Sequence, residues 1–468
     1  MRLLYHPGGK LMRLACFMSG SGTNVRRIIE RQLKLGKNSP FEVALIFTDN
    51  KSSNAEKIAS EYGIPFFCND IREFYKRRNA KRSDLSVRRE YDAETRNIME
   101  KKGIDAVALC GYMSIVTHEI CNNFLTLNVH PADLRRKDKA GKRLYAGLMG
   151  EQCIRAAMLN HDPEVRSTVH ITTTELDGGP IIFVSQPVKL DLSLCENDSS
   201  LDLASEKYIE TLKEKGDWVI YPEAVEMLAR GRIGIEGEAI LIDGIKYENG
   251  YCSSEEKAAL RKAMREQRRG MGEAEIRGKS AIITGKLLTL PEFQDAKAIM
   301  FYSAMPREVQ TKQAIREAQG IGKSILLPVT EEGEIRACCF TGFDNMKKGE
   351  HGILEPLEST DENNAKNSVQ QDKQNSEGKD IDLVVVPGLA FDENGARLGF
   401  GLGCYDAFLN SLGSNSNCKG SNCKRIGLSF ESQIVERIPR EEWDVPMDII
   451  ITEKRVIRAR KGQESDNS

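Results

Sequence analysis

The sequence lacks an excess of charge of either sign. Its 468 residues include 67 Lys and Arg and 69 Asp and Glu, which gives a formal net charge of −2 at pH 7. Binding to a nucleic acid backbone depends on a field of positive charge that displaces counterions from phosphates. This chain has no such field overall, so we expect no nucleic acid among its partners. Binding of small anionic molecules at local clusters of positive charge is still compatible with this composition.

Long apolar runs are also absent. No stretch approaches the roughly 20 apolar residues that a membrane-spanning helix needs, and residues 1–30 contain no apolar core of a signal peptide. The 12 cysteines are scattered instead of forming the framework of a small disulfide-rich domain. We therefore expect a cytoplasmic protein with reduced thiols and no membrane partner. The sequence does not indicate its oligomeric state.

The composition and the hydrophobic pattern predict the fold class. Hydrophobic residues make up 40% of the chain and charged residues 29%, as in globular proteins with a substantial core. The length exceeds that of one ordinary domain and predicts two. Apolar runs alternate with helical stretches in both halves, which indicates βαβ units. The predicted fold is α/β, with a Rossmann-like, mostly parallel N-terminal domain at residues 12–249 and a second α/β domain at residues 255–456.

Three segments fall outside these cores. Residues 358–380 consist almost entirely of polar and charged residues, which cannot repay the entropy lost on ordering, so we predict a disordered insertion. Met1–Lys10 is expected to be a loose extension without a function, and residues 457–468 a flexible tail.

Polar motifs follow the predicted strands of the N-terminal domain. Ser19–Asn24 is a glycine-rich turn between a strand and a helix, where free N–H groups and the helix dipole favour an anion. Alone, this motif indicates a tight turn equally well. Asn128–Pro131 follows a later strand, and Thr168–His170 leads to the loop carboxylate Asp177. Because catalytic groups gather at the carboxyl ends of such strands, these motifs predict an active site.

Residues 12 to about 248 resemble the folate-dependent formyltransferase family, most closely the phosphoribosylglycinamide formyltransferases. The resemblance implies direct transfer of a formyl group from 10-formyltetrahydrofolate to an amine, through a tetrahedral oxyanion that must be stabilised. The matching motifs, in chain order, are Gly22-Thr23-Asn24, Gly111-Tyr112-Met113, Asn128-Val129-His130-Pro131, Thr168-Val169-His170, Leu176-Asp177-Gly178-Gly179 and Ile220-Tyr221-Pro222.

The same resemblance implies roles for individual residues. Asn128 would donate a hydrogen bond to the oxyanion, His130 would stabilise it as a cation or proton donor, and Asp177 would tune His130 and relay protons. Further residues would bind the acceptor with its phosphate, namely Gly22, Thr23, Asn24 and Asp217, and the folate, namely Met113 and His170.

The acceptor stays open because this chain departs from the family on the acceptor side. Family members continue Asn-x-His-Pro with Ser-Leu-Leu-Pro and a Lys-Gly turn, whereas here Ala132–Leu134 runs into the basic stretch Arg135–Lys139. A Glu-His pair of the family is replaced by Asp217-Trp218. The resemblance favours glycinamide ribonucleotide, an intermediate of purine biosynthesis. Water, an aminoacyl-tRNA and an amino sugar are the alternatives, of which the charge balance disfavours tRNA.

The C-terminal half carries a basic helix and a second glycine-rich motif. Glu255–Met271 is expected to be a helix with Lys257, Arg261, Arg265 and Arg268 on one face, and such a face is usually only solvated. In Pro387–Asp406, which follows a strand, glycines recur at every second position from Gly399 to Gly403. Backbone without side chains can approach a polyphosphate, and the carboxylate of Asp406 suits Mg²⁺.

Residues 255 to about 456 resemble the 5-formyltetrahydrofolate cyclo-ligase family, with further matches at Gly352–Pro356 and Trp443–Asp448. The resemblance implies that MgATP activates the formyl oxygen of 5-formyltetrahydrofolate as a phosphate, and that N10 then closes the ring to give 5,10-methenyltetrahydrofolate. It implies ATP binding by Lys257, Arg261, Arg397, Gly399, Gly401, Gly403 and Tyr405, folate binding by Glu308, and Mg²⁺ binding by Asp406 and Asp448.

This half also departs from its family. Phe400, Leu402 and Cys404 stand where the family commonly has two basic residues and a tyrosine. Losing two phosphate-facing charges removes transition-state stabilisation and can leave a domain that only binds folate. The sequence favours a bifunctional folate enzyme. The alternative is a formyltransferase with a different acceptor, tethered to a degenerate, folate-binding cyclo-ligase module.

Overall fold

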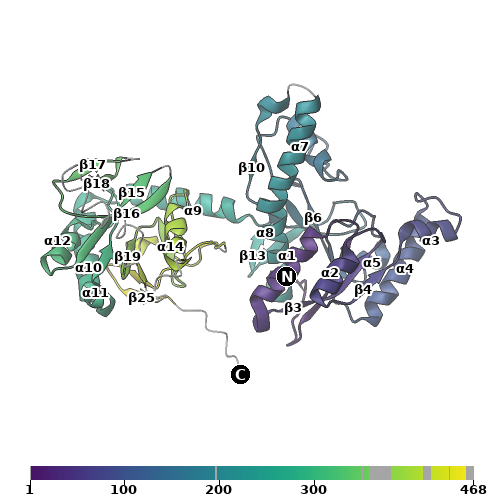
Figure 1. The fold of residues 1–468 in the computed structure, drawn as a ribbon, viewed down its shortest axis with the longest axis horizontal. Helices are drawn as coiled ribbons and strands as arrows, with labels where there is room; N and C mark the ends of the chain where they lie inside the picture. Colours follow the sequence, from purple (N-terminus) through teal and green to yellow (C-terminus); the bar gives the residue numbers. More distant parts are fainter. Residues whose placement is uncertain are drawn as a thin grey trace, which may run out of the picture. The chain divides into compact units, whose positions relative to one another are not determined.

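The computed structural model divides into two compact units, Met1–Ser254 and Glu255–Ser468, which are described separately below (Figure 1). The predicted insertion at 358–380 lies outside the described residues, as do residues 460–468 of the predicted tail. No helix among the described residues is long and apolar enough to cross a membrane. The described residues are 2–195, 198–331, 333–349, 352–357, 381–414, 423–441 and 443–459.

A seven-stranded sheet forms the centre of the N-terminal unit, with the order β4-β3-β2-β5-β6-β8-β9. The first five strands in this order pair in parallel, and β8 and β9 are antiparallel. This arrangement confirms the prediction of an α/β fold with a mostly parallel sheet. The strands are β2 (Met12–Met18), β3 (Phe41–Thr48), β4 (Phe66–Cys68), β5 (Ala106–Leu109), β6 (Leu125–His130), β8 (Thr168–Ile171) and β9 (Ile181–Val184).

Helices follow the strands of this sheet in the order that the sequence pattern predicts. α1 (Thr23–Leu35) buries its apolar face through Val25, Ile28 and Ile29, whose spacing of three and four residues places them on one side of a helix. The remaining helices are α2 (Ala55–Tyr62), α3 (Ile71–Arg77), α4 (Leu85–Lys101), α5 (His118–Cys121), α6 (Glu151–Leu159), α7 (Asp198–Leu212) and α8 (Trp218–Ala229), with a π-helix at Lys213–Asp217.

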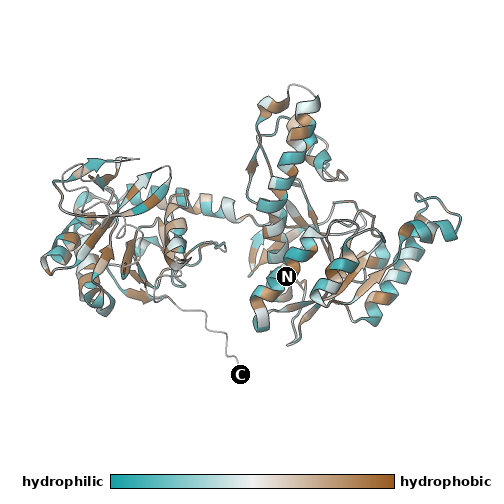
Figure 2. Ribbon diagram, in the orientation of Figure 1, coloured by the Kyte–Doolittle hydropathy of each residue, from teal (hydrophilic) through white to brown (hydrophobic). Residues whose placement is uncertain are grey.

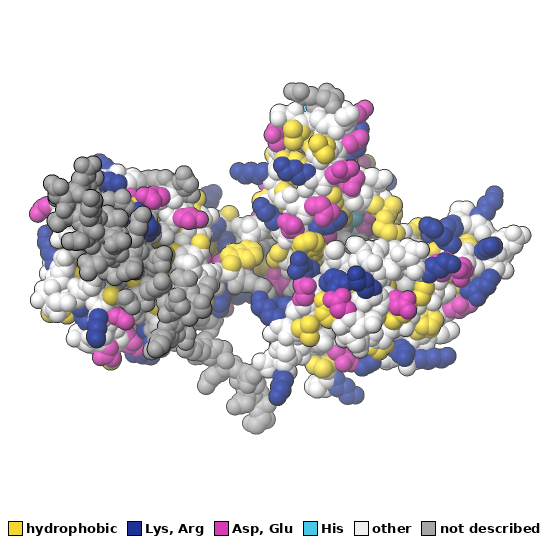
Figure 3. Space-filling view, viewed as in Figure 1, with side chains coloured by type: hydrophobic (Ala, Val, Ile, Leu, Met, Phe, Trp, Pro, Cys, Tyr) yellow, Lys and Arg dark blue, Asp and Glu magenta, His cyan; other side chains and the backbone are white. Residues whose placement is uncertain are grey.

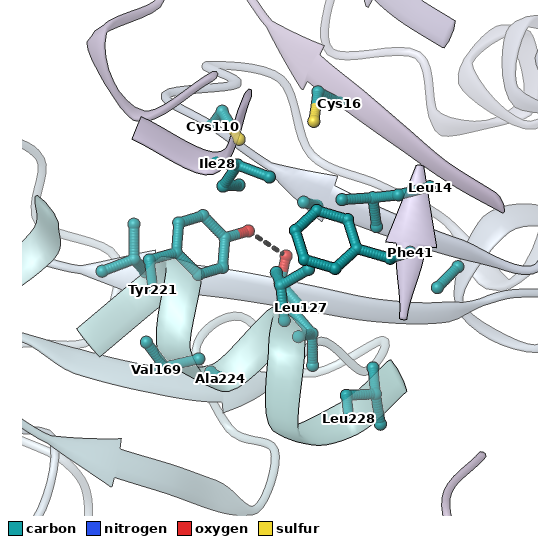
Figure 4. Close-up of a cluster of buried hydrophobic side chains, with 14 of the residues drawn as sticks. Leu14, Cys16, Ile28, Phe41, Cys110, Leu127, Val169, Tyr221, Ala224 and Leu228 are labelled. Carbon is teal, nitrogen blue, oxygen red and sulfur yellow. Dashed lines mark hydrogen bonds between the residues drawn. The ribbon is translucent and has the colours of Figure 1, made fainter. Parts of the chain in front are cut away.

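The buried side chain of Tyr221 anchors α8 to the central sheet. The Tyr221 ring is fully buried between α8 and the sheet, together with Leu14, Ile28 and Leu228 (Figure 4). Its hydroxyl lies 2.9 Å from the carbonyl oxygen of Leu127 on β6 and 3.1 Å from that of Leu109 on β5. Leu109 ends β5, and Leu127 directly precedes Asn128 in β6, so the contact holds α8 against the sheet beside Asn128.

The expectation that Met1–Lys10 forms a loose extension was wrong. Residues Arg2–Leu3 form β1, which pairs with β11 (Ile233–Glu236) in a small sheet completed by β12 (Ala239–Ile242) and β13 (Ile245–Tyr247). Leu4 and Tyr5 pack against the main core. A two-residue strand is too short to show an alternating pattern, so the sequence alone carries no signal for it.

The C-terminal unit is also built on a seven-stranded sheet, with the order β16-β15-β14-β19-β22-β24-β25. The five inner strands pair in parallel, and the two edge strands are antiparallel. The strands are β14 (Ala298–Met300), β15 (Ser324–Glu331), β16 (Glu334–Cys339), β19 (Leu383–Val386), β22 (Lys424–Leu428), β24 (Ile449–Ile451) and β25 (Val456–Arg458).

Helices and short strands cover this second sheet. Because β25 pairs with β24, residues 457 and 458 of the predicted flexible tail belong to an ordered edge strand, and the tail prediction was wrong for them. The helices used below are α9 (Ser253–Arg269), α10 (Glu273–Thr289), α12 (Lys312–Gly320) and α14 (Cys404–Ser414).

Hydropathy explains why the inner strands lie where they do. Hydrophobic residues concentrate in the central strands of each unit, whereas the outer helices show mixed colours (Figure 2). All four residues of Leu383–Val386 are fully buried, as expected for a parallel strand covered on both faces. On the face shown in Figure 3, Lys and Arg side chains are interspersed with Asp and Glu over the N-terminal unit.

Candidate active sites

Four predicted site residues of the N-terminal unit lie together at the carboxyl end of β6. Asn128 and His130 are the polar residues that end this strand, and His170 lies opposite Asn128 on β8. Asp177 comes from the loop between β8 and β9. Its Oδ2 lies 3.5 Å from His130 Nδ1, and its Oδ1 lies 3.4 Å from His170 Nε2 and 3.5 Å from Asn128 Nδ2. The predicted catalytic trio is therefore assembled around one carboxylate.

His130 is held between two acceptors. Its Nε2 lies 2.9 Å from the carbonyl oxygen of Tyr145, which can only accept, so Nε2 carries the proton of the neutral ring. The other nitrogen, Nδ1, faces Asp177. Burial lowers the pKa of His130, and the charge of Asp177 opposes this shift. A neutral ring can therefore take a proton on Nδ1, where the carboxylate stabilises the resulting cation.

His170 and Asn128 are mutually oriented. His170 Nδ1 donates to the carbonyl oxygen of Ile171 at 3.0 Å. In the neutral ring Nε2 is therefore an acceptor 3.2 Å from Asn128 Nδ2, and in the protonated ring it donates to Asp177 Oδ1 at 3.4 Å. The amide nitrogen of Asn128 thus points toward His170 and Asp177 in this structure. Donation of a hydrogen bond to an oxyanion requires this amide to turn toward the substrate, so that role of Asn128 stays a prediction.

Asp177 occupies a strained and tightly held position. Its φ of 50° is left-handed, which costs roughly 1 kcal/mol or more for a residue with a Cβ. Arg143 donates to its carbonyl oxygen and, at 2.9 Å, to that of Gly179, while the Gly147 N–H donates to Oδ2 at 2.9 Å. Burial opposes ionisation of Asp177, but the His170 hydrogen bond and the charge of His130 outweigh it and lower its pKa to about 2.

Arg143, Tyr145 and Gly147 are site residues that the sequence analysis missed. They follow the basic stretch Arg135–Lys139. That stretch forms one leg of a hairpin, in which Lys137 bridges to Arg143 and the Leu144 N–H donates to the Arg136 carbonyl at 3.0 Å. The return leg delivers its guanidinium, carbonyl and N–H groups to the catalytic cluster. Only the positive charge of Arg143 is visible as a signal in the sequence.

The predicted phosphate turn lies beside Asp217. Gly22 has φ 75°, and a Cβ there would lie 2.5 Å from Ile58 Cδ1, so only glycine fits before α1. The Asp217 carboxyl is 5% exposed and accepts a hydrogen bond from Ser167 Oγ at 2.5 Å. Burial raises the pKa of Asp217 to about 6, although hydrogen bonds from Ser167 and Asn24 oppose the shift. The turn residue Asn24 and Asp217 thus share one polar cluster.

Asp217→Asn should change how the stability of the N-terminal unit depends on pH. A carboxyl with a raised folded pKa contributes stability that is present below about pH 4 and is lost as the pH rises through 6. The wild type should therefore lose about 2 kcal/mol relative to the variant between about pH 4.5 and pH 7.5. Urea unfolding at both pH values tests this, with Trp218 as the reporter in a Trp443→Phe background. If the wild type and the variant differ in unfolding free energy by the same amount at both pH values, Asp217 does not have a raised pKa in the folded protein.

Met113, a predicted folate contact, lies in a loop whose backbone is held by hydrogen bonds and whose apolar side chain is exposed. The Met113 N–H donates to Ser19 Oγ at 2.9 Å, and that hydroxyl donates to Asp49 at 2.6 Å. Ser114 also donates to Asp49. The side chain of Met113 is nevertheless 57% exposed. A rigid backbone that presents an uncovered apolar side chain suits a flat ligand, which is what the predicted folate contact requires.

In the C-terminal unit the second glycine-rich motif forms a loop before α14. Gly401 has φ 116° and Gly403 φ 74°, conformations that favour glycine. Arg397 Nη2 lies 2.7 Å from Asp406 Oδ2, and its guanidinium stands 5.6 Å from the centroid of the Tyr405 ring. Arg261 of α9 donates from Nε to the Gly399 carbonyl at 3.0 Å. The structure therefore brings most of the predicted ATP-binding residues to this loop.

Lys257 differs from the prediction. It is 7% exposed, and its Nζ donates to Glu441 and, at 2.7 Å, to Asp444. Both acceptors are largely buried carboxylates. The sequence predicts a cation presented to ATP phosphates, but Lys257 is instead paired with two carboxylates of its own unit. The partners lie more than 180 residues away along the chain, so spacing within α9 cannot predict the pairing.

The predicted pair of Mg²⁺ ligands is not assembled either. Asp406 is engaged by Arg397 and by the Val445 N–H at 3.2 Å. Asp448 precedes β24 and lies 3.0 Å from Nε of Arg425, a residue near the start of the neighbouring strand β22. Within the described ranges, no group of three or more His, Cys, Asp and Glu is arranged to hold a metal ion. These residues do not fit a Mg²⁺ site, and magnesium enters below only as part of the nucleotide substrate.

Glu308, the predicted folate ligand, is buried, and one of its carboxyl oxygens lacks a hydrogen bond. The residue is 6% exposed, and burial raises the pKa of its carboxyl. Its Oε2 accepts from the Met305 N–H at 3.0 Å, whereas Oε1 lacks a hydrogen-bond partner among the described residues. The Arg268 guanidinium stands 3.9 Å from Oε1. A buried carboxyl with one open oxygen is suited to accept a ligand N–H.

Each unit matches the model of a known protein family. Residues 12–204 match the family model of the formyl transferases, and residues 253–453 match that of the 5-formyltetrahydrofolate cyclo-ligase family. A Haemophilus influenzae 5-formyltetrahydrofolate cyclo-ligase is 32% identical over 36% of this chain and 83% of its own length. A phosphoribosylglycinamide formyltransferase of the same organism is 24% identical over 52% of this chain and all of its own length.

A solved structure is also similar to the N-terminal unit. The glycinamide ribonucleotide transformylase 1 of Symbiobacterium toebii is 26% identical, with a TM-score of 0.38, and the match covers 50% of this chain and 94% of that protein.

Proposed function

The chain belongs to the formyl transferase family in its N-terminal part and to the 5-formyltetrahydrofolate cyclo-ligase family in its C-terminal part, and we propose that it catalyses two folate reactions. The first transfers the formyl group of 10-formyltetrahydrofolate to the amine of glycinamide ribonucleotide, a step of purine biosynthesis. The second converts 5-formyltetrahydrofolate to 5,10-methenyltetrahydrofolate at the expense of MgATP.

The observation that carries the first reaction is the cluster of Asn128, His130 and His170 around the Asp177 carboxylate. In the reaction, the acceptor amine attacks the formyl carbon, and the carbonyl oxygen becomes an oxyanion. The bond between the formyl carbon and N10 then breaks, so the amine must lose a proton and N10 must gain one. A neutral His130 beside an ionised Asp177 can take and return that proton. Asn128 is the half-buried amide next to it and serves the oxyanion.

Glycinamide ribonucleotide is proposed as the acceptor for three reasons. The turn at Gly22–Asn24 leads into α1, where N–H groups at a helix start suit its phosphate. Asp217, which shares a hydrogen-bonded cluster with Asn24, would contact the sugar or the amine of the same molecule. The similar protein of Haemophilus influenzae is itself a phosphoribosylglycinamide formyltransferase.

The second reaction is supported by the Gly399–Gly403 loop and by Glu308. ATP would lay its phosphates along the loop beside Arg397, and the open Oε1 of Glu308 would accept an N–H of the pterin ring. The formyl oxygen of 5-formyltetrahydrofolate then attacks the γ-phosphorus and releases ADP. N10 attacks the activated carbon and loses its proton, and inorganic phosphate leaves as the methenyl bridge forms.

The proposal is tested by supplying the full chain with 10-formyltetrahydrofolate and each acceptor in turn. Glycinamide ribonucleotide should give formylated product and stoichiometric tetrahydrofolate, detected by mass spectrometry. A product only with an amino sugar would replace the acceptor, and formate without any acceptor would indicate a deformylase. Separately, 5-formyltetrahydrofolate should stimulate ATP hydrolysis. Absence of this stimulation would reduce the C-terminal unit to a folate-binding module.

A further inference from the structure

The glycine-rich loop of the C-terminal unit contributes no cationic side chain of its own between its glycines. Phe400 and Leu402 fill those positions, and they are 40% and 70% exposed. Polyphosphate binding needs more positive charge than backbone N–H groups supply. Arg397, which precedes the loop, is already paired with Asp406. If ATP binds here, further charge must come from a neighbouring element. The basic face of α9 is the element that the structure places against the loop.

We propose that Arg265, together with Arg261, forms a phosphate clamp on α9 that supplies the charge missing from the loop, with Phe400 as its support. This inference rests on the proposed use of ATP and adds to it a residue that determines phosphate affinity. The occupant is a nucleoside triphosphate, held through its phosphates.

Contacts with the loop backbone carry the inference. Arg261 and Arg265 are one helical turn apart, and their side chains reach consecutive carbonyls of the loop. Arg261 Nε lies 3.0 Å from the Gly399 carbonyl oxygen, and Arg265 Nη2 lies 3.4 Å from that of Phe400. In the part of the chain that the structure describes, their other N–H groups make no hydrogen bond. Both guanidinium groups thus lie at the loop with donors still unused.

Phe400 explains why Arg265 stays near the loop although it is exposed. The guanidinium groups of Arg265 and Arg268 each lie 6.0 Å from the centroid of the Phe400 ring, within reach of a cation–π attraction. Arg268 is buried and donates through Nε and Nη2 to the Arg307 carbonyl, so it is already committed to the fold. Arg265 makes no comparable pair of hydrogen bonds within the fold, so its guanidinium can bind a ligand.

The clustering of charge also favours an anionic occupant. Burial and the nearby charge of Arg265 lower the pKa of Arg261, although the charges of Glu441 and Asp444 oppose this shift. Two guanidinium groups at i and i+4 repel each other, and the loop carbonyls offset only part of that cost. A phosphate between them would remove the repulsion and accept two charge-assisted hydrogen bonds. Arginine suits this task because its fork matches two phosphate oxygens.

The inference is tested by titrating MgATP into the full-length protein by isothermal titration calorimetry. Arg265→Ala should weaken binding about tenfold or more, the scale of a lost hydrogen bond to a charged group. Lys262→Ala, which removes a neighbouring exposed charge of the same helix, is the matched control and should bind like the wild type. Phe400→Arg in the Arg265→Ala background should restore most of the affinity, because it returns a cation to the same place.

Each outcome decides a different point. Loss in Arg265→Ala with rescue by Phe400→Arg supports the clamp. An Arg265→Ala variant that binds like the control overturns it, and so does a loss that Phe400→Arg does not repair, since that would indicate a structural role. A wild type that binds MgATP while Arg265→Ala is neutral leaves the proposed ATP dependence standing. A wild type that binds no MgATP overturns both.

Discussion

Asp177→Asn is expected to slow formyl transfer by at least about a hundredfold while the N-terminal unit stays folded. The carboxylate faces Nδ1 of His130 and stabilises the cation that forms when this ring takes a proton from the acceptor amine. An asparagine has nearly the same shape and can still accept the hydrogen bond from the Gly147 N–H. It carries no charge, however, so the protonated ring would stand in a buried site without compensation.

The rate is measured as tetrahydrofolate release with saturating 10-formyltetrahydrofolate and acceptor. Glu175→Gln is the matched control, because it neutralises an exposed carboxylate two residues earlier in the same loop. That variant should keep nearly full activity, and both variants should unfold at a similar temperature. An Asp177→Asn protein with near wild-type turnover would remove this carboxylate from the mechanism.

Lys257→Ala is expected to destabilise the C-terminal unit by about 3 kcal/mol or more, the usual effect of removing one partner from a buried ion pair. Glu441 and Asp444 have side chains that are 10% and 17% exposed, so without the ammonium two carboxylates would face each other in a poorly solvated place. The variant would therefore lose ATP-dependent activity through its fold. Loss of activity alone could not assign Lys257 to ATP binding.

Urea unfolding followed by Trp443 fluorescence measures this effect, in a Trp218→Phe background that silences the tryptophan of the other unit. Lys262→Ala is the control, since it removes an exposed lysine of the same helix. Adding Glu441→Gln and Asp444→Asn to the Lys257→Ala protein should recover part of the stability that Lys257→Ala loses. A midpoint that is unchanged in Lys257→Ala would show that these ion pairs contribute nothing.

The sequence predicted both folds because the inner strands are continuous apolar runs. Leu383–Val386 is an example, and it lies buried in the centre of its sheet. The Asn128 and His130 motif was likewise predictable, because polar residues that end an apolar strand stand out. β1 was not predictable, since its two residues show no period. The partners of Lys257 escaped prediction because they are brought to it only by the folded chain.

The catalytic cluster shows a second limit of sequence reasoning. Two of its contacts are backbone groups, the Tyr145 carbonyl that faces His130 and the Gly147 N–H that faces Asp177. Backbone groups are present at every position, so no residue type marks them. The hairpin that delivers them was visible in the sequence only as an unusual basic stretch. The hairpin reaches the catalytic cluster only because its second strand folds back against the first.

The Asp177→Asn protein tests whether one chain carries two independent folate reactions. This variant is supplied with 5-formyltetrahydrofolate and MgATP, and 5,10-methenyltetrahydrofolate is followed by its near-ultraviolet absorbance. We expect formation at the wild-type rate, because Asp177 belongs to the other unit. No methenyl product from either the variant or the wild type would contradict it.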